Sequence, residues 1–201
     1  QELERWDHPR TSPTRRGLTP VSNGGVHSPA MAIDRELPAE RAAEERIGQL
    51  GIDASSMAAI GNIFRVATTI RNHMERSVLS GPDLSFTAFT VLWVLWIWGE
   101  QEARHVADES GISRGTLTGV VTTLENRGLV ARRTHPDDRR SVLVGLTAPG
   151  VDLMTELFPA FNAEEAKVSA GLDTDRKEQL ADALRTILRT VEQLDGDRNG
   201  R

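Results

Sequence analysis

Three neighbouring stretches decide the fold of this chain: GISRGTLT at residues 111–118, NRGLV at residues 126–130 and DRRS at residues 138–141. Gly111 can adopt the left-handed conformation that ends a helix, and Ser113 can cap the next one. Such a short turn sets two helices at a steep angle, as in a helix-turn-helix. A basic β-hairpin follows directly. The stretches therefore predict a winged helix-turn-helix whose second helix enters the major groove of double-stranded DNA.

The flanking sequence predicts a mainly α-helical chain in which this β-hairpin wing is the only sheet. Apolar residues at spacings of three and four predict helices over residues 38–50, 55–79, 85–99, 101–110, 113–127 and 174–194. A further helix begins at Thr147, and Pro159 is expected to kink it or end its first section. Strands are expected at residues 129–133 and 141–146, where Val142, Val144 and Leu146 alternate.

The domain boundaries follow from these patterns. Residues 1–37 contain four prolines and no apolar periodicity, which predicts a disordered tail, either inert or a basic arm that touches DNA. Met31 is a candidate natural start. Residues 38–195 form one domain, with a DNA-reading lobe at about 85–147 and dimerisation helices at about 38–84 and 148–195. Residues 196–201 are expected to be a flexible end.

Composition excludes several classes of protein. The chain has no cysteine, which rules out disulfides, thiolate metal sites and cysteine-based redox sensing. Its longest apolar run, residues 91–98, is too short to span a bilayer, and no secretory signal is visible, so a cytoplasmic location is expected. The five histidines have no metal-ligand spacing. No phosphate-binding loop, nucleophile elbow or paired metal motif occurs, so neither an enzyme nor a cofactor is expected.

The net charge of −5 hides a local polarity. Residues 113–146 contain six arginines and three acidic residues, whereas residues 147–195 contain ten acidic and five basic residues. A basic face on an acidic body attracts phosphate locally and discourages indiscriminate binding to nucleic acids. The helices at both ends flank a lobe that is too small to bury their apolar faces. Pairing with a second copy would bury them, so we expect a homodimer with two-fold symmetry.

Over about residues 55–194 the sequence resembles the MarR family of winged-helix transcriptional regulators. The resemblance is carried by residues 113–124, ENRGLV at 125–130, DRRS at 138–141 and LTAPG at 146–150, in that order. It implies a homodimeric regulator, more often a repressor than an activator, that binds a palindromic operator. It also implies release from that operator by a small-molecule effector.

The second helix of the helix-turn-helix supplies the first group of expected DNA contacts. Thr116, three residues after the cap, is neither Glu nor Gln, so no capping box covers the helix N-terminus, which stays open to phosphate. The expected contacts are Ser113, Arg114, Thr116 and Thr118, with a merely solvated face as the alternative. Members of the family often have a basic residue where this chain has Gly119.

The wing supplies the second group. Arg132 and Arg133 are expected to reach the flanking DNA backbone. The family resemblance implies that Arg140 enters the minor groove while Asp138 holds its guanidinium group in position. Arg139 is either a phosphate contact or solvated.

The resemblance also implies an effector pocket between the dimerisation helices and the DNA-reading lobe. Candidates to line it are Arg71, His73, Met74, Trp93 and Trp96, which would suit a small aromatic or anionic compound. The tryptophans could equally be core residues. A urate-type site is disfavoured because Phe89 is followed by Thr90 and not by Asp.

One alternative function stays open. Gly119 and the acidic total charge would suit a small-molecule-binding or protein-interaction module that kept the fold and lost specific DNA binding. The arginines of the second helix and of the wing argue against it.

Overall fold

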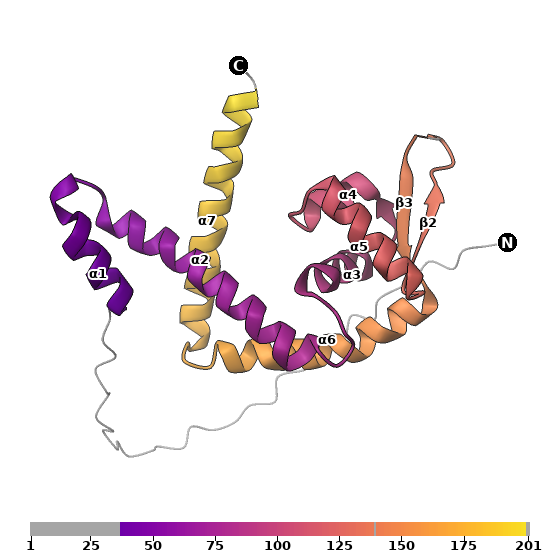
Figure 1. Ribbon diagram of the computed structural model, residues 1–201, viewed down its shortest axis with the longest axis horizontal. Coiled ribbons are helices and arrows are strands. Elements are labelled where there is room, and N and C mark those ends of the chain that lie inside the picture. Colours follow the sequence, from indigo (N-terminus) through magenta and orange to yellow (C-terminus); the bar gives the residue numbers. More distant parts are fainter. Residues whose placement is uncertain (1–36, 139, 200–201) are drawn as a thin grey trace, which may run out of the picture. The chain divides into compact units, whose positions relative to one another are not determined.

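The computed structural model describes residues 37–138 and 140–199. Its elements, in chain order, are α1 (Pro38–Ile47), the 3-10 turn η1 (Gly48–Leu50), α2 (Ala54–Met74), the π-helical turn η2 (Glu75–Leu79), α3 (Phe86–Trp98), β1 (Gln101–Glu102), α4 (Ala103–Glu109), α5 (Arg114–Asn126), β2 (Val130–Thr134), β3 (Val142–Leu146), α6 (Ala148–Val168) and α7 (Thr174–Asn199) (Figure 1). The chain is mainly helical with one small sheet, which confirms the predicted fold class.

Two expectations about the ends of the chain need comment. The tail predicted to be disordered lies outside the described residues except for Leu37, which directly precedes α1. Residues 196–199 were expected to be flexible, but they continue α7. A single Gly196 costs a helix only about 1 kcal/mol, and Arg198 in the last turn complements the helix dipole.

The chain divides into two compact units, Gln1–Ile52 and Asp53–Arg201. In the first unit, Pro38 opens α1, and the Glu40 carboxylate accepts the Leu37 backbone N–H at 2.7 Å. Gly51, with φ of +64°, ends the 3-10 turn. All the other elements belong to the second unit. None of the described helices is both long and apolar enough to cross a membrane.

Helix α2 buries much less than its apolar stripe predicts. It begins at Asp53, whose side chain accepts the Ser56 backbone N–H, and only Met74 near its C-terminal end is buried. Phe64 is 69% exposed. The stripe then passes into the π-helical turn η2, where Leu79 is buried, and the chain turns at Gly81 and Pro82, just after the predicted end of the helix at residue 79.

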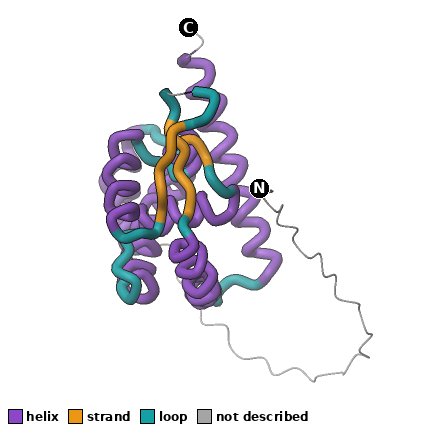
Figure 2. The backbone as a smooth tube through the Cα atoms, turned by 90° about the vertical axis from the view of Figure 1, so that its right-hand side faces the viewer, coloured by secondary structure: helices purple, strands orange, loops and turns teal. Residues whose placement is uncertain are grey.

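Helices α3, α4 and α5 and the sheet enclose the hydrophobic core. Serines cap two of these helices: Ser113 accepts the Thr116 N–H as predicted, and Ser85, where a helix was predicted to begin, accepts the Ala88 N–H. The sheet is antiparallel in the order β1-β3-β2, and Figure 2 shows its three strands side by side. The prediction of helix at residues 101–102 was wrong, because Gln101 and Glu102 pair with β3.

As the central strand, β3 is covered more fully than a solvent-facing hairpin strand. Leu143 is buried, as is Val144 on the opposite face, whereas Val142 is exposed. The simple alternation expected from Val142, Val144 and Leu146 is therefore wrong at its first position. Antiparallel pairing of β2 with β3 runs from Val130–Leu146 to Thr134–Val142.

Helix α6 is joined tightly to the end of β2. Thr147 caps it by accepting the Gly150 N–H at 3.2 Å, and its own backbone N–H donates to the Leu129 carbonyl. A Cβ atom on Gly150 would lie 2.1 Å from that carbonyl oxygen, so only glycine fits there. The helix does not end at Pro159, which is exposed, because Leu157 and Phe161 on either side are buried in the core.

Candidate nucleic-acid interface and effector cavity

The turn before α5 has the predicted helix-turn-helix geometry. Gly111 has φ of +64°, and the Ile112 N–H donates to the Ala107 carbonyl of α4. Ser113 then caps α5, and its hydroxyl also lies 2.8 Å from the Thr116 hydroxyl. No acidic residue occurs in the first turn of α5. The N-terminus of α5 therefore carries positive dipole charge without a competing carboxylate on its own first turn.

The outer face of α5 is exposed along its length. Arg114, Thr116 and Thr118 are exposed, whereas Leu117 and Val121 are buried. Thr118 donates its hydroxyl proton to the Arg114 carbonyl at 2.9 Å. The exposed face consequently presents one arginine and hydroxyl groups that are already hydrogen-bonded to their own helix.

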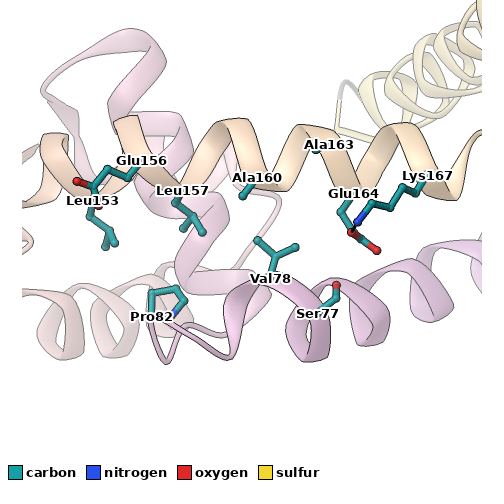
Figure 3. A pocket seen from close by; sticks show the side chains of 10 residues that line it. All are labelled: Ser77, Val78, Pro82, Leu153, Glu156, Leu157, Ala160, Ala163, Glu164 and Lys167. Carbon is teal, nitrogen blue, oxygen red and sulfur yellow. Dashed lines mark hydrogen bonds and ion pairs between the residues drawn. The ribbon is translucent and has the colours of Figure 1, made fainter.

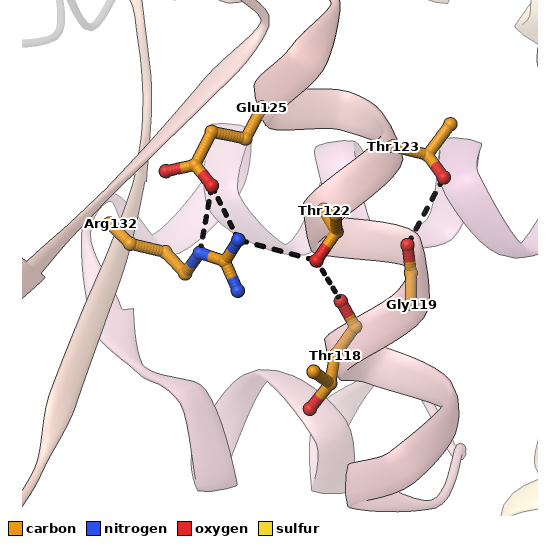
Figure 4. Close-up of polar contacts among 6 residues, drawn as sticks. All are labelled: Thr118, Gly119, Thr122, Thr123, Glu125 and Arg132. Carbon is orange, nitrogen blue, oxygen red and sulfur yellow. Dashed lines mark hydrogen bonds and ion pairs between the residues drawn. The ribbon is translucent and has the colours of Figure 1, made fainter.

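The base of the wing has its arginines paired with carboxylates. Arg132 donates from Nε to Glu125 Oε2 at 3.0 Å, from Nη2 to the same oxygen, and from Nη2 to Thr122 Oγ1 at 3.2 Å (Figure 4). Arg133 donates from Nε to Glu100 Oε1 at 2.7 Å and from Nη2 to Oε2. Both arginines were expected to reach outward toward the DNA backbone, and both instead contact acidic side chains of the same chain.

Each ion pair shifts the pKa of one of its members. The hydrogen bonds from Arg132 lower the pKa of the Glu125 carboxyl below its ordinary value. The hydrogen bond to Glu100 raises the pKa of the Arg133 guanidinium. Each shift favours the charged form of its group, the Glu125 carboxylate and the Arg133 guanidinium.

The wing tip differs from its base because its arginine is not paired. The Arg140 side chain is exposed, and it has no hydrogen bond or ion pair within the described ranges 37–138 and 140–199. Asp138 accepts the Arg140 backbone N–H at 2.9 Å. The contact that the structure gives to Asp138 thus fixes the turn of the backbone, whereas the expected contact was with the guanidinium group. Arg139 lies outside the described residues.

Two charged residues that the sequence did not single out tie helices to their neighbours: Arg127, just after α5, contacts the segment after α2, and Glu75 of η2 contacts the start of α3. Arg127 donates from Nη1 to the Asp83 carbonyl at 2.7 Å and from Nη2 to the Pro82 carbonyl at 2.6 Å. Glu75 accepts the Phe86 N–H at 2.8 Å. Arg127 belongs to the ENRGLV block, but nothing in that block indicates a partner 44 residues away.

An aromatic cavity of about 460 Å³ lies between α2, α3 and α6. Of the predicted effector residues, Met74 and Trp93 line it, and the Arg71 guanidinium carbon lies 5.6 Å from the centre of the Phe86 ring at its wall. The other lining residues were not predicted: Ile70, Phe86, Phe89, Thr90, Phe158, Phe161 and Glu165. The lining residues from α6, Phe158, Phe161 and Glu165, could not be predicted from the sequence, because their position depends on how α6 crosses α3.

Two predicted effector residues lie elsewhere. Trp96 does not line the cavity and packs against Phe158, with ring centres 5.3 Å apart. His73 contacts Glu164 of α6, with its Nε2 atom 2.8 Å from Oε1. The carboxylate of Glu164 also accepts a hydrogen bond from Lys167. These contacts, from Lys167 first and then from His73, lower the pKa of Glu164.

Glu164 and Lys167 belong to a second hollow of about 580 Å³ between α6 and the segment from Ser77 to Pro82 (Figure 3). It is more open and more polar than the aromatic cavity. Of these two hollows, the aromatic cavity is the one that combines flat apolar walls with a nearby guanidinium group, so it is the better candidate to bind an aromatic acid. Within residues 37–138 and 140–199, no three side chains that could share a metal ion come together.

The family comparison agrees with this geometry. The model of the MarR family matches residues 84–142, which run from just before α3 to the start of β3. A curated relative, the uncharacterized HTH-type transcriptional regulator YwaE of Bacillus subtilis, is 38% identical over 141 residues, covering 70% of this chain and 81% of its own. The transcriptional repressor MprA of Escherichia coli is 27% identical over 139 residues, covering 65% of this chain and 79% of its own.

A solved structure supports the same assignment. BpsR of Bordetella bronchiseptica, described with the regulation of its DNA binding by 6-hydroxynicotinic acid, is 26% identical. It superposes with a TM-score of 0.55 over 64% of this chain and 98% of BpsR. The helix-turn-helix, the hairpin wing, the family match and these relatives together assign the function class. The chain belongs to the MarR family and is a transcriptional regulator, not an enzyme.

Proposed function

We propose that this chain is a homodimeric repressor that binds a palindromic operator in double-stranded DNA and is released from it by a small aromatic acid. In this proposal, α5 enters the major groove with Ser113, Arg114, Thr116 and Thr118. The wing lies along the neighbouring minor groove, with Arg140 inserted at its tip.

The exposed face of α5 is the observation that carries the proposal. It ends in an open N-terminus and is flanked by a wing whose tip has an exposed arginine. Phosphate and base edges are the chemical groups that such a face would bind. Repression is supported by the relative MprA, which is named a transcriptional repressor.

Dimerisation is supported by the exposed apolar residues of α2 and α7. Phe64, Leu188 and Leu194 are each more than half exposed, which is costly in a monomer in water. A second copy that covers them would present two α5 helices about 34 Å apart, the spacing of successive major grooves.

The effector would bind in the aromatic cavity. Its ring would pack against Trp93 and Phe86, and its carboxylate would lie near Arg71. The regulation of BpsR by 6-hydroxynicotinic acid supports an effector of this class. Binding would release DNA to the extent that the effector prefers the dimer that cannot bind DNA.

An electrophoretic mobility shift tests the proposal. The purified full-length chain is titrated onto a duplex from immediately upstream of its own gene, with a shuffled duplex of the same composition as the control. We expect a shift of the upstream duplex at a protein concentration at least about 1,000-fold lower than for the shuffled duplex. Equal affinity for both duplexes would contradict a sequence-specific regulator.

The paired state of Arg132 and Arg133 gives the alternative function a specific basis, because it removes free positive charge from the wing base. A module that has lost DNA binding would shift neither duplex and would still bind aromatic acids, as measured by tryptophan fluorescence.

A further inference from the structure

We infer that Arg132 is a positioning residue which, through Glu125 and Thr122, fixes the angle between the wing and α5 and so determines operator specificity. This inference rests on the proposed function, in which α5 and the wing tip contact DNA together. It departs from the expectation that Arg132 binds a phosphate.

The contacts of Arg132 all lead to one face of α5. Its Nε and Nη2 atoms converge on Oε2 of Glu125, and Nη2 also reaches Thr122. The Thr122 hydroxyl in turn donates to the Thr118 carbonyl at 2.8 Å, one turn earlier in α5 (Figure 4). Two nitrogens of a planar group held by two separate residues define its orientation, not only its distance.

The contacts of Arg132 with Glu125 and Thr122 form a brace, and the register of the sheet places this brace at the base of the wing. Arg132 pairs with Val144 of β3, close to the buried Val130 end of the hairpin. From Arg132 to the turn at Pro136 the extended chain spans about 13 Å, so a tilt of about 10° at the base would move the tip by about 2.3 Å. Hydrogen bonds tolerate only about 0.5 Å of such displacement. A small loss of orientation at Arg132 therefore misplaces Arg140.

The opposite face of the hairpin has a matching pair. Arg133, the next residue of β2, is held by Glu100, and the Glu100 side chain lies over Gly145 at 3.3 Å from where a Cβ would be. Adjacent strand residues point to opposite faces. The base of the wing is thus held on both faces, by α5 on one and by the segment before β1 on the other.

The experiment distinguishes a brace from a phosphate contact by whether Glu125→Gln weakens or strengthens DNA binding. Affinities for the operator and for a shuffled duplex are measured by fluorescence anisotropy over a range of salt concentrations. The variants are Arg132→Gln, Glu125→Gln and the charge-exchanged Arg132→Glu/Glu125→Arg. The control is Arg176→Gln, which breaks an exposed arginine–carboxylate pair on α7.

A brace predicts that Arg132→Gln and Glu125→Gln both weaken operator binding about 10-fold, the scale of one groove contact. Both should leave the salt dependence and the affinity for the shuffled duplex unchanged, and the charge exchange should restore most of the loss. A phosphate contact predicts instead that Glu125→Gln strengthens binding to both duplexes, and that Arg132→Gln lowers the salt slope by about 0.9. That result would overturn the inference, as would two variants that bind like wild type.

Amide hydrogen exchange of the hairpin, residues 130–146, gives a readout that needs no DNA. Both single variants should exchange several-fold faster there than wild type, and the charge exchange should restore protection. If wild type binds no DNA but the exchange pattern holds, the proposed function fails while the brace stands. If wild type binds its operator and neither exchange nor affinity responds to the variants, the brace fails while the proposed function stands.

Discussion

The winged-helix lobe, from α3 to β3, and the long helices α2 and α7 use their apolar residues in opposite ways. Helix α3 has 13 residues and buries six of them, from Ala88 to Leu95. Helix α2 has 21 residues and buries one, and α7 has no buried side chain that the structure describes. Both long helices nevertheless carry regular apolar stripes.

The difference separates two sources of stability. The core of the winged-helix lobe is built within one chain, and residues of α6 such as Leu157 and Phe161 complete it. The apolar stripes of α2 and α7 are buried only slightly by the chain itself, and a partner that covered them would add stability. The same sequence pattern, apolar residues at spacings of three and four, therefore has two different structural outcomes.

The largest effect is expected from substitutions that disrupt the proposed dimer surface. Leu184→Glu/Leu188→Glu places two charges on the α7 stripe, and Leu188 is 62% exposed in the single chain. We expect monomers by sedimentation and a loss of operator affinity of at least about 100-fold, because two linked half-sites bind far more tightly than one. Thr186→Glu/Gln193→Glu, on the opposite face of α7, should remain dimeric. A wild-type chain that sediments as a monomer at micromolar concentration would contradict the prediction.

The next effect tests the core of the lobe, which α6 helps to close. Gly150→Ala should destabilise it by about 3 kcal/mol, because the added Cβ meets the Leu129 carbonyl oxygen and the backbone must move. Gly119→Ala is the matched control: it has open space around it and should stabilise α5 by about 0.5–1 kcal/mol. Chemical denaturation followed by circular dichroism measures both. Equal effects of the two substitutions would show that the junction is not tightly packed.

Within the lobe, a surface residue should affect binding without affecting the core. Arg140→Ala is expected to weaken operator binding by about 1–3 kcal/mol and to leave the thermal midpoint unchanged, because its exposed side chain contributes one groove contact and no packing. Anisotropy with the mapped operator measures the first effect and calorimetry the second. Binding like wild type would show that the wing tip does not contact DNA.

The aromatic cavity lies where α2 meets the winged-helix lobe, so substitutions of its lining residues test whether an effector binds between these two regions. Trp93→Ala and Arg71→Ala should each weaken binding of a hydroxylated aromatic acid by about 1–2 kcal/mol, through lost ring packing and a lost charge partner. Trp96→Phe and His73→Asn should bind like wild type, because neither residue lines the cavity. Isothermal titration with 6-hydroxynicotinic acid provides the measurement. The opposite ranking would locate the effector elsewhere.

The smallest effect concerns the contact between α2 and α6. Lys167 and His73 lower the pKa of Glu164 below its ordinary value of 4.5, so this contact stabilises the fold above that pH and is lost as the pH falls through the lower folded-state pKa. Denaturation between pH 6 and pH 3 should show wild type losing stability relative to Glu164→Gln in this acid range. Glu156→Gln, on the same helix, should follow wild type. Parallel curves for all three proteins would contradict the assignment.

The sequence was sufficient where structure depends on near neighbours. The cap at Ser113 and the helix starts at Ser85 and Thr147 were predicted correctly, because a capping side chain bonds to a backbone N–H three residues on. It failed where the cause is distant. Nothing near Gln101 indicates a strand, because its pairing with Val144 depends on how the hairpin packs.

The predicted site shows the same division. Thr116 and Thr118 are exposed as predicted, and so is Arg114, which is the first residue of α5. Periodicity also puts Arg132 and Arg133 on opposite faces of the hairpin, but it does not identify Glu125 or Glu100 as their partners. The same holds for His73, whose partner Glu164 is 91 residues away.

The hydrogen bond of the Thr118 hydroxyl limits which bases this residue could contact. Its proton is committed to the Arg114 carbonyl, so the oxygen has only lone pairs to offer. In the major groove the exocyclic amino groups of adenine and cytosine are the donors, whereas guanine presents only acceptors. With α5 in the groove, this position would favour adenine or cytosine and disfavour guanine, so one hydrogen bond inside the helix would already restrict the letters of the operator.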